Sequence, residues 1–200
     1  MNDIEKEIKI NGVKAGAILG LCLLVLSIIS FYIITGISIT PIAFIAIPIV
    51  FTFLIPIVLV LLFCFEQRKR IGGYWNLRQA TTGVFIMFFV AYAIQTIGRD
   101  LVFAKFIEPD MIPKIETVTI NATTQVLRDA KSTPQQIDKK IGELKTDFAN
   151  QKTVTTAAVI QSTAISIIFA FVLSLIFGAL LKREAPVYAT ATEEDATRLN

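Results

Sequence analysis

Four stretches of the sequence are long, apolar and free of charged side chains. They cover residues 15–35, 41–65, 79–98 and 154–181, and the first three lie within a segment of residues 14–98. A helix needs about 20 such residues to cross a hydrocarbon core of about 30 Å, and a chain in lipid must satisfy its own backbone hydrogen bonds. The sequence therefore predicts an all-α membrane protein with four transmembrane helices in two hairpins.

The composition supports this class and argues against several functions. Hydrophobic residues make up 54% of the chain and charged residues 18%, against about 25% charged in an average soluble domain. A net charge of +3 gives no indication of a nucleic-acid partner. The sequence has no histidine, the commonest general base and metal ligand, and no phosphate-binding loop or nucleophile elbow. We expect no catalytic residue, no cofactor and no metal, and we interpret Cys22 and Cys64 as apolar fillers.

A basic loop at residues 66–78 separates the second and third spans and orients the chain. Its positive side chains are Arg68, Lys69, Arg70 and Arg78. Short loops rich in Lys and Arg stay on the cytoplasmic side, so we expect both termini in the cytoplasm. Residues 1–13 are then a cytoplasmic segment, either a short amphipathic helix at the interface or a solvated tail. Residues 183–200 are predicted to be a disordered cytoplasmic tail.

The same loop has features that suit a docking surface. Gly72 and Gly73 permit a tight turn with positive φ, and Asn76 is placed to cap the next helix. Tyr74 and Trp75 suit the inner membrane interface. The predicted interaction residues of this loop are Arg68, Arg70, Gly72, Gly73, Tyr74, Trp75 and Arg78.

Small residues and prolines distinguish the first two spans. Gly16 and Gly20 lie about one helical turn apart and predict a close-packing face on the first span. Pro48 and Pro56 each remove a backbone hydrogen bond from the second span and bend it. The bend is either a hinge in a moving helix or a fixed feature of packing, and we favour the fixed bend.

Residues 99–153, between the third and fourth spans, form a segment that we expect to be external, hence periplasmic, and helical. Apolar residues recur at helical spacing in two stretches, which predicts a helical hairpin of residues 111–130 against 134–151. Thr133 begins the second arm as its cap. The apolar stripe of that arm is a candidate docking surface made of Ile137, Ile141, Leu144 and Phe148.

The fourth span, residues 154–182, is predicted to continue directly from the second arm. By helical rise, Gln161 in this span lies at a depth similar to that of Gln95 in the third span. A buried amide in lipid seeks a partner across helices, so we predict that Gln95 faces Gln161, or the hydroxyls of Ser162 and Ser166. The pairing is either packing or the lining of a pathway, and packing is favoured because no membrane-embedded charge accompanies it.

Two motifs resemble those of a known family. The inner run GGYWNLRQA at residues 72–80 and the outer run KFIEPDMIPK at residues 105–114 are similar to motifs of a domain-of-unknown-function family of four-span inner-membrane proteins in Bacteroidota. The matching positions are Gly72, Gly73, Tyr74, Gln79, Ala80, Phe106, Ile107, Glu108, Pro109 and Asp110. The resemblance covers most of residues 10–182. It implies the bacterial inner membrane as the compartment and brings no activity, cofactor or catalytic residue.

Three functional hypotheses follow. The first is a non-enzymatic subunit or scaffold of a membrane or envelope complex, which contacts membrane lipid and docks other envelope proteins, or a second copy of itself, through the external hairpin and the basic loop. The second is a small transporter or permeability factor that uses the region of Gln95 and Gln161. The third is an enzyme acting on lipid-linked substrates through Arg78, Arg99 and Asp100. It ranks last because no nucleophile has a base beside it.

Overall fold

The computed structural model describes residues 3–36, 40–152 and 156–183, and the regular elements in these ranges are helices. In chain order they are α1 (Asp3–Gly36), α2 (Pro41–Ile49), the π-helix η1 (Val50–Leu54), α3 (Ile55–Arg70), α4 (Leu77–Gln95), the π-helix η2 (Thr96–Ile107), α5 (Met111–Asp129), α6 (Pro134–Lys152) and α7 (Thr156–Leu181). Four stretches are long and apolar enough to cross a membrane: Ile4–Gly36, Ile42–Arg70, Leu77–Ile107 and Ala157–Leu181. The predicted all-α class with four spans is confirmed.

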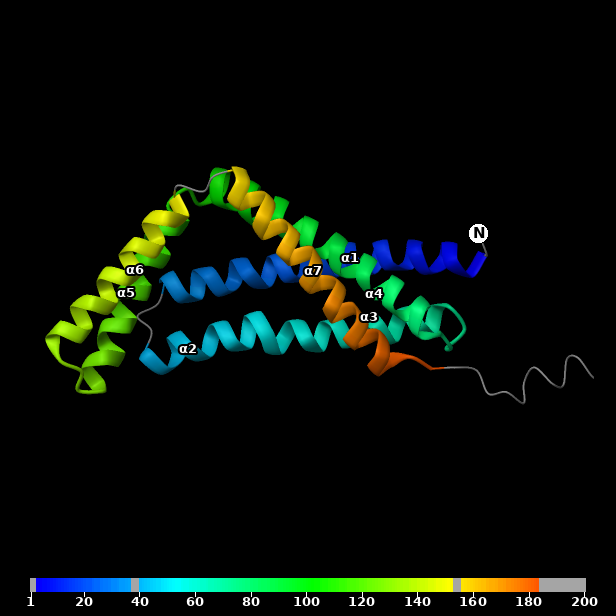
Figure 1. Cartoon of the computed structure of the whole chain (residues 1–200), viewed down its shortest axis with the longest axis horizontal. Helices are drawn as coiled ribbons and strands as arrows, with labels where there is room; N and C mark the ends of the chain where they lie inside the picture. Colours follow the sequence, from blue (N-terminus) through cyan, green and yellow to red (C-terminus); the bar gives the residue numbers. More distant parts are fainter. Residues whose placement is uncertain (1–2, 37–39, 153–155, 184–200) are drawn as a thin grey trace, which may run out of the picture.

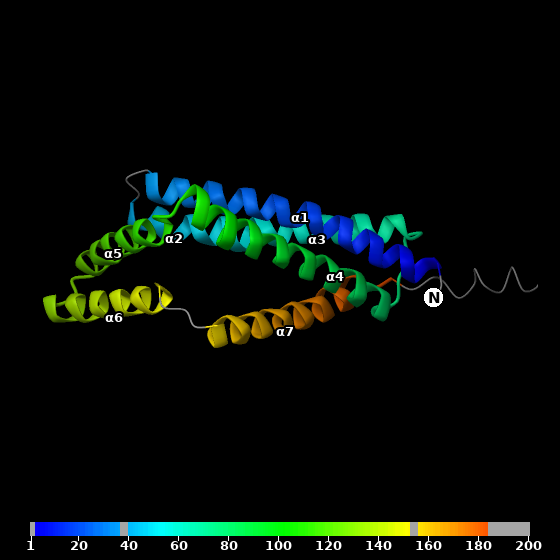
Figure 2. The same ribbon diagram turned by 90° about the horizontal axis from the view of Figure 1, so that it is seen from above.

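The helices form an elongated bundle with the α5–α6 hairpin at one end (Figure 1). The N-terminal end of α1 and the loop between α3 and α4 lie at the opposite end. We call these the hairpin end and the loop end. In the bundle α1 packs along α4, and both α3 and the base of α5 contact α1. The last span, α7, packs on α4 and diverges from the bundle toward its own N-terminal end (Figure 2).

Glycines on α1 allow this helix to approach α4 closely. A Cβ at Gly16 would lie 2.6 Å from the carbonyl oxygen of Met87, and one at Gly12 would lie 3.0 Å from that of Gly83. Gly20, one turn further on, also leaves no room for a side chain against α4. Small residues at this spacing let two membrane helices make backbone contact. The predicted packing face at Gly16 and Gly20 is confirmed, and Gly12 extends it.

A widened turn separates the two prolines of the second span. Within η1 and its C-terminal cap, the Ile55 N–H donates to the carbonyl oxygen of Val50, five residues earlier. The ring of Pro56 has no N–H and clashes with a carbonyl four residues before it in a regular helix, so the widened turn accommodates the ring. The predicted distortion near Pro48 and Pro56 is present. That it is a fixed bend rather than a hinge stays a prediction.

Three predicted boundaries differ from the structure. Residues 3–13 are the first turns of α1 rather than a separate interfacial helix, because buried Ile8 packs against α4. The third span does not end at residue 98 but continues through η2 to Ile107. The axes of α6 and α7 are inclined to one another (Figure 1), so a single straight helix over residues 134–181 is wrong. Residues 153–155 and the predicted tail from 184 on lie outside the described residues.

Candidate functional site

The loop between α3 and α4 folds around its glycine pair, as predicted. Gly72 and Gly73 have φ angles of +93° and +84°, and their N–H groups donate to carbonyl oxygens in the last turn of α3 at 3.3 and 2.9 Å. Glycine adopts this left-handed backbone without steric cost. Asn76 caps α4, as predicted: its Oδ1 accepts from the N–H of Gln79, whose side-chain oxygen accepts from the N–H of Asn76, both at 2.9 Å.

Trp75 joins this loop to the end of the last span. Its indole is 2% exposed, and Nε1 donates to the carbonyl oxygen of Leu181 at 2.8 Å. The main chains of Trp75 and Arg183 exchange two hydrogen bonds, at 2.9 and 3.1 Å. We call Trp75, Leu181 and Arg183 the α7 clamp. Protein encloses the Trp75 ring, so it is not exposed to the membrane interface; its level in the membrane stays a prediction. The neighbouring Tyr74 is exposed and lies beneath the Arg183 guanidinium.

The predicted basic residues of the loop divide into one that supports the clamp and others on the surface. Arg68 is half-buried, and its Nη1 donates to the carbonyl oxygen of Leu181 at 3.4 Å. Arg70 is exposed and pairs with a glutamate one turn earlier in α3. Arg78 is exposed, and its guanidinium lies 3.9 Å from a carboxylate at the start of α1. Arg68 is therefore part of the fold, whereas Arg70 and Arg78 remain accessible at the loop end.

Gln67 is buried, although it lies within the charged run that ends α3. The side chain is 3% exposed, and Nε2 donates to the sulfur of Met87 at 3.1 Å. Oε1 has no hydrogen-bond partner among the described residues and lies against Gly83 of α4. Sequence reasoning missed this residue because its charged neighbours indicate a solvated surface. The only signal was its place on the same helix face as Cys64, one turn earlier.

The predicted helical hairpin is present, with its two apolar stripes turned inward. The residues of α6 that are shielded from solvent at helical spacing are Ile137, Ile141, Leu144 and Phe148. The helix that α6 packs against is α5, whose Ala122 is buried. The stripe that we predicted as a docking surface is therefore used inside the hairpin. Thr133 and Gln136 form the predicted capping box at the start of α6.

Aromatic rings hold the end of the third span against α1, and an ion pair joins that end to α5 of the hairpin. Phe103 of η2 is 2% exposed and meets Phe31 and Tyr32 of α1 edge-on, at centroid distances of 5.5 and 6.0 Å. At the turn before α5, Lys114 Nζ donates to Glu108 Oε1 at 2.7 Å, and this hydrogen bond raises the pKa of the Lys114 ammonium. The base of α5 also contacts α1 and α2. The hairpin is thus fixed relative to three of the four spans.

Gln95 and Gln161 lie at matching levels but on different faces. Phe85 meets Phe171 edge-on at 5.8 Å, a register that places the two amides at similar depth. The contact to α7 at that depth comes instead from Tyr92, whose hydroxyl lies near the hydroxyls of Thr163 and Ser166. Gln161 is exposed on α7, whereas Gln95 turns toward α1 and α5. The prediction was correct for depth and wrong for the face on which Gln95 lies.

Gln95 lines a cleft of about 540 Å³ at the hairpin end. The cleft lies between α1, α2 with η1, the junction of α4 with η2, and the base of α5. Its polar lining residues are Ser27, Ser30, Thr52, Gln95, Arg99 and Thr119. The rest of the lining is apolar and includes Phe44 and Phe51. Sequence reasoning placed a polar region at this depth but between the wrong spans.

These observations define an all-α protein with four helices of membrane-spanning length and a helical hairpin docked at one end of the bundle. The chain belongs to a family of proteins of unknown function, DUF4199, whose model matches residues 14–183. No curated protein and no solved structure matches the chain. The resemblance to an uncharacterised family is confirmed, whereas the bacterial group and the span number of its members stay predictions.

Proposed function

We propose that the chain is a non-enzymatic integral membrane protein that serves as a subunit or scaffold of a membrane complex. In this proposal the α5–α6 hairpin docks an envelope protein or a second copy of the chain. The basic loop at residues 66–78 is a second docking surface at the opposite end. The absence of histidine from the whole sequence supports a role without acid–base catalysis.

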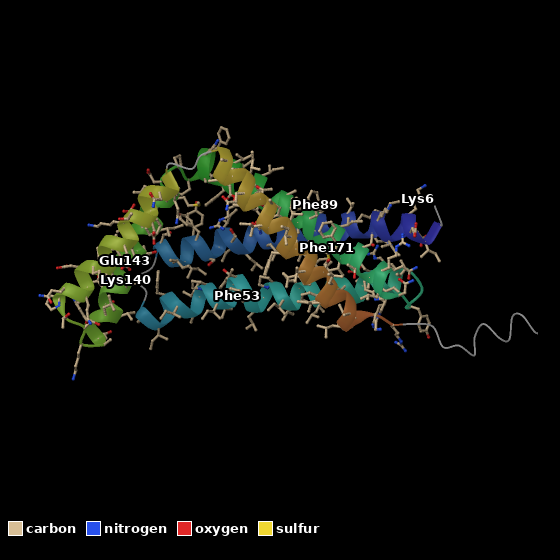
Figure 3. The ribbon with its side chains drawn as sticks, in the orientation of Figure 1. Lys6, Phe53, Phe89, Lys140, Glu143 and Phe171 are labelled. Carbon is tan, nitrogen blue, oxygen red and sulfur yellow. The ribbon has the colours of Figure 1, made fainter. Side chains whose placement is uncertain are left out.

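The observation that carries the proposal is a hairpin that is fixed at its base and polar on its outer face. The aromatic contacts of Phe103 and the packing of α5 on α1 and α2 restrain its position. Because the apolar stripes face inward, the outer face of α6 offers charged side chains of both signs, among them Lys140 and Glu143, which lie on the hairpin far from Lys6 (Figure 3). A mixed-charge, pre-positioned surface favours specific and reversible docking.

The loop end offers a different surface. Lys69, Arg70 and Arg78 are exposed in the same loop region as the exposed ring of Tyr74. The α7 clamp holds this loop in place from beneath, so its basic side chains are presented from a fixed backbone. Such a surface suits acidic lipid head groups or an acidic protein segment.

Photo-crosslinking in native membranes tests the docking role. A crosslinking amino acid is placed at Lys139, Glu143 or Asp147, which are exposed on α6. We expect a discrete protein adduct, identified by mass spectrometry, from at least one of these positions. Ile168, exposed on α7, is the matched control in the lipid-facing span, and it should give no discrete adduct. Absence of adducts at all hairpin positions, under conditions where the protein is intact, would reject docking through α6.

The cleft at the hairpin end favours a second candidate, a small transporter or permeability factor. Its polar lining at Gln95 and Arg99 is the feature that a permeant would use. This candidate requires water to reach the middle of the bundle. Cysteines introduced at Gln95 and Thr52, which both line the cleft, in a background without Cys22 and Cys64 would be probed with a water-soluble thiol reagent. Protection of both positions would remove the transport hypothesis.

A further inference from the structure

The cleft at the hairpin end has the chemistry of an anion site with an apolar floor. Among the described residues that line it there is one charged side chain, the cation Arg99, and no carboxylate. The other polar groups are the Gln95 amide and the hydroxyls of Ser27, Ser30, Thr52 and Thr119. A guanidinium binds phosphate oxygens with two parallel N–H bonds, and amide and hydroxyl groups are suited to complete the coordination of an oxyanion.

The volume fits a small ligand or a head group with the first part of its chains. Ligand sites in proteins enclose about 300–1,000 Å³, and this cleft encloses about 540 Å³. Its apolar walls come from the first two spans and include Leu23 of α1, Phe44 of α2 and Phe51 of η1. A soluble anion such as inorganic phosphate would gain nothing from these apolar walls, because it has no apolar part to bury. The ligand is therefore expected to be amphipathic.

The position of the cleft along the spans indicates the source of that ligand. From Lys14, the last charged residue before the first span, Ser30 is about 24 Å along the helix. Arg99 follows Gly98, which packs on Leu24 of α1, so Arg99 lies within about two turns of the level of Ser30. A hydrocarbon core is about 30 Å thick. Both residues are thus in the half of the core on the hairpin side, and the long Arg99 side chain can extend toward its boundary. Lipid phosphates lie at this boundary, with acyl chains directed toward the cleft's apolar walls.

Both π-helical segments contribute to the cleft, and the turn of η2 that holds Arg99, unlike η1, has no proline ring near it to account for it. Thr52 belongs to η1 and Arg99 to η2. π-Helical turns are rare, and they occur frequently at functional sites. Each such turn shifts the following side chains around the helix axis. A regular helix would place Thr52 and Arg99 on different faces from those that they occupy here.

We propose that this cleft binds the phosphate head group of an acidic membrane lipid from the leaflet at the hairpin end. Arg99 is the principal anchor, Gln95 and the Ser and Thr hydroxyls surround the head group, and the acyl chains lie along Phe44 and Phe51. The proposal is independent of the docking role of α6, because none of the cleft's lining residues lies on α6.

Native mass spectrometry of the purified full chain tests the site. The protein is titrated in detergent with phosphatidylglycerol and with phosphatidylcholine of identical acyl chains. We expect the acidic lipid to bind about tenfold more tightly to the wild type, and Arg99→Gln to remove that preference, as loss of one charge-assisted contact predicts. Arg128→Gln is the matched control: it removes the same charge from an exposed position on α5 outside the cleft, and it should keep the preference.

A second variant and a soluble competitor test the same lipid site. Ser30→Phe fills the cleft and should abolish the tight acidic-lipid adduct, while unchanged hydrogen exchange in α5 and α6 shows that the hairpin end remains folded. Excess inorganic phosphate should not displace the lipid. Retention of the preference in Arg99→Gln, retention of tight binding in Ser30→Phe, or equal binding of both lipids by the wild type would each overturn the lipid site. Displacement by inorganic phosphate would show a soluble anion site and overturn it also.

Discussion

The loop end and the hairpin end of the bundle are held together in different ways. At the loop end the contacts join residues that are distant in sequence: Trp75 donates to Leu181, and Met87 accepts from Gln67. At the hairpin end the base of α5 contacts α1 and α2, but the arms of α5 and α6 pair as sequence neighbours across a short turn, and an open cleft lies beside the base of α5. Long-range burial fixes the arrangement of the spans, whereas a local hairpin can open without separating them.

This difference can be measured because each end has its own reporter. Cys64 is completely buried at the loop end, so its alkylation, in a Cys22→Ala background, reports the opening of that end. Backbone amide hydrogen exchange in α5 and α6 reports the opening of the hairpin. A variant that affects only one reporter identifies the two ends as separate cooperative units, whereas parallel changes in both would identify one.

Loss of the Trp75 indole should have the largest effect. Trp75→Ala removes a buried ring and its hydrogen bond to Leu181, a change that costs about 3–5 kcal/mol. Alkylation of Cys64 should accelerate about a hundredfold or more, with little change in α5 and α6 exchange. The control is Tyr74→Ala, which removes the exposed neighbouring ring and should change the rate much less. If hydrogen exchange in α5 and α6 rises as much as Cys64 alkylation, the two ends open together rather than as separate units.

A side chain at Gly16 should have the next largest effect. Gly16→Leu introduces a Cβ 2.6 Å from the Met87 carbonyl oxygen, and the two helices must separate to admit it, at about 1–3 kcal/mol. Thermal unfolding in detergent should occur at a lower temperature, and Cys64 should react about tenfold faster. Gly36→Leu on the same helix is the control, because a Cβ there meets nothing within 4 Å. Equal stability of the two variants would refute close packing of α1 on α4.

Features that depend on local sequence could be predicted. The four spans, the hairpin arms, the Asn76 and Thr133 caps and the Gly72–Gly73 turn are fixed by neighbours within a few residues. The similar depth of Gln95 and Gln161 could also be predicted, because the rise per residue along a helix is constant. Each of these depends on spacing along a single helix or turn, which the sequence states directly.

Features that depend on which helix packs against which face could not be predicted. Trp75 follows a Gly-Gly turn beside a span, where interfacial anchoring is the usual role, and nothing near it in sequence indicates a bond to Leu181. Gln95 points away from α7 because Tyr92 occupies that contact. Gln67 lies among charged residues, yet the packing of α3 against α4 buries it. In each case a distant residue decides the side chain's surroundings.

Replacement of Gln67 should strengthen the loop end. Its Oε1 is buried without a hydrogen bond in the described part of the chain, and such a group costs about 1–3 kcal/mol. Gln67→Met keeps the length of the side chain and removes that atom, so Cys64 alkylation should slow several-fold. Gln161→Met, at an exposed position of α7, should leave the rate unchanged. Faster alkylation in Gln67→Met would show that the amide is bound by a polar partner that stabilises the loop end.

The smallest effect is expected at the turn of the hairpin, where Lys131 adopts a φ of +55°. A residue with a Cβ loses roughly 1 kcal/mol in this left-handed conformation, and glycine does not. Lys131→Gly should therefore slow hydrogen exchange in α5 and α6 a few-fold and leave Cys64 alkylation unaltered. Lys139→Gly makes the same chemical change within α6, where glycine is unfavourable by about 1 kcal/mol, and should accelerate exchange. Slower exchange in Lys131→Gly and faster exchange in Lys139→Gly, with the same Cys64 alkylation rate in both, would confirm two separate units. A changed Cys64 alkylation rate in either variant would show that the ends are coupled.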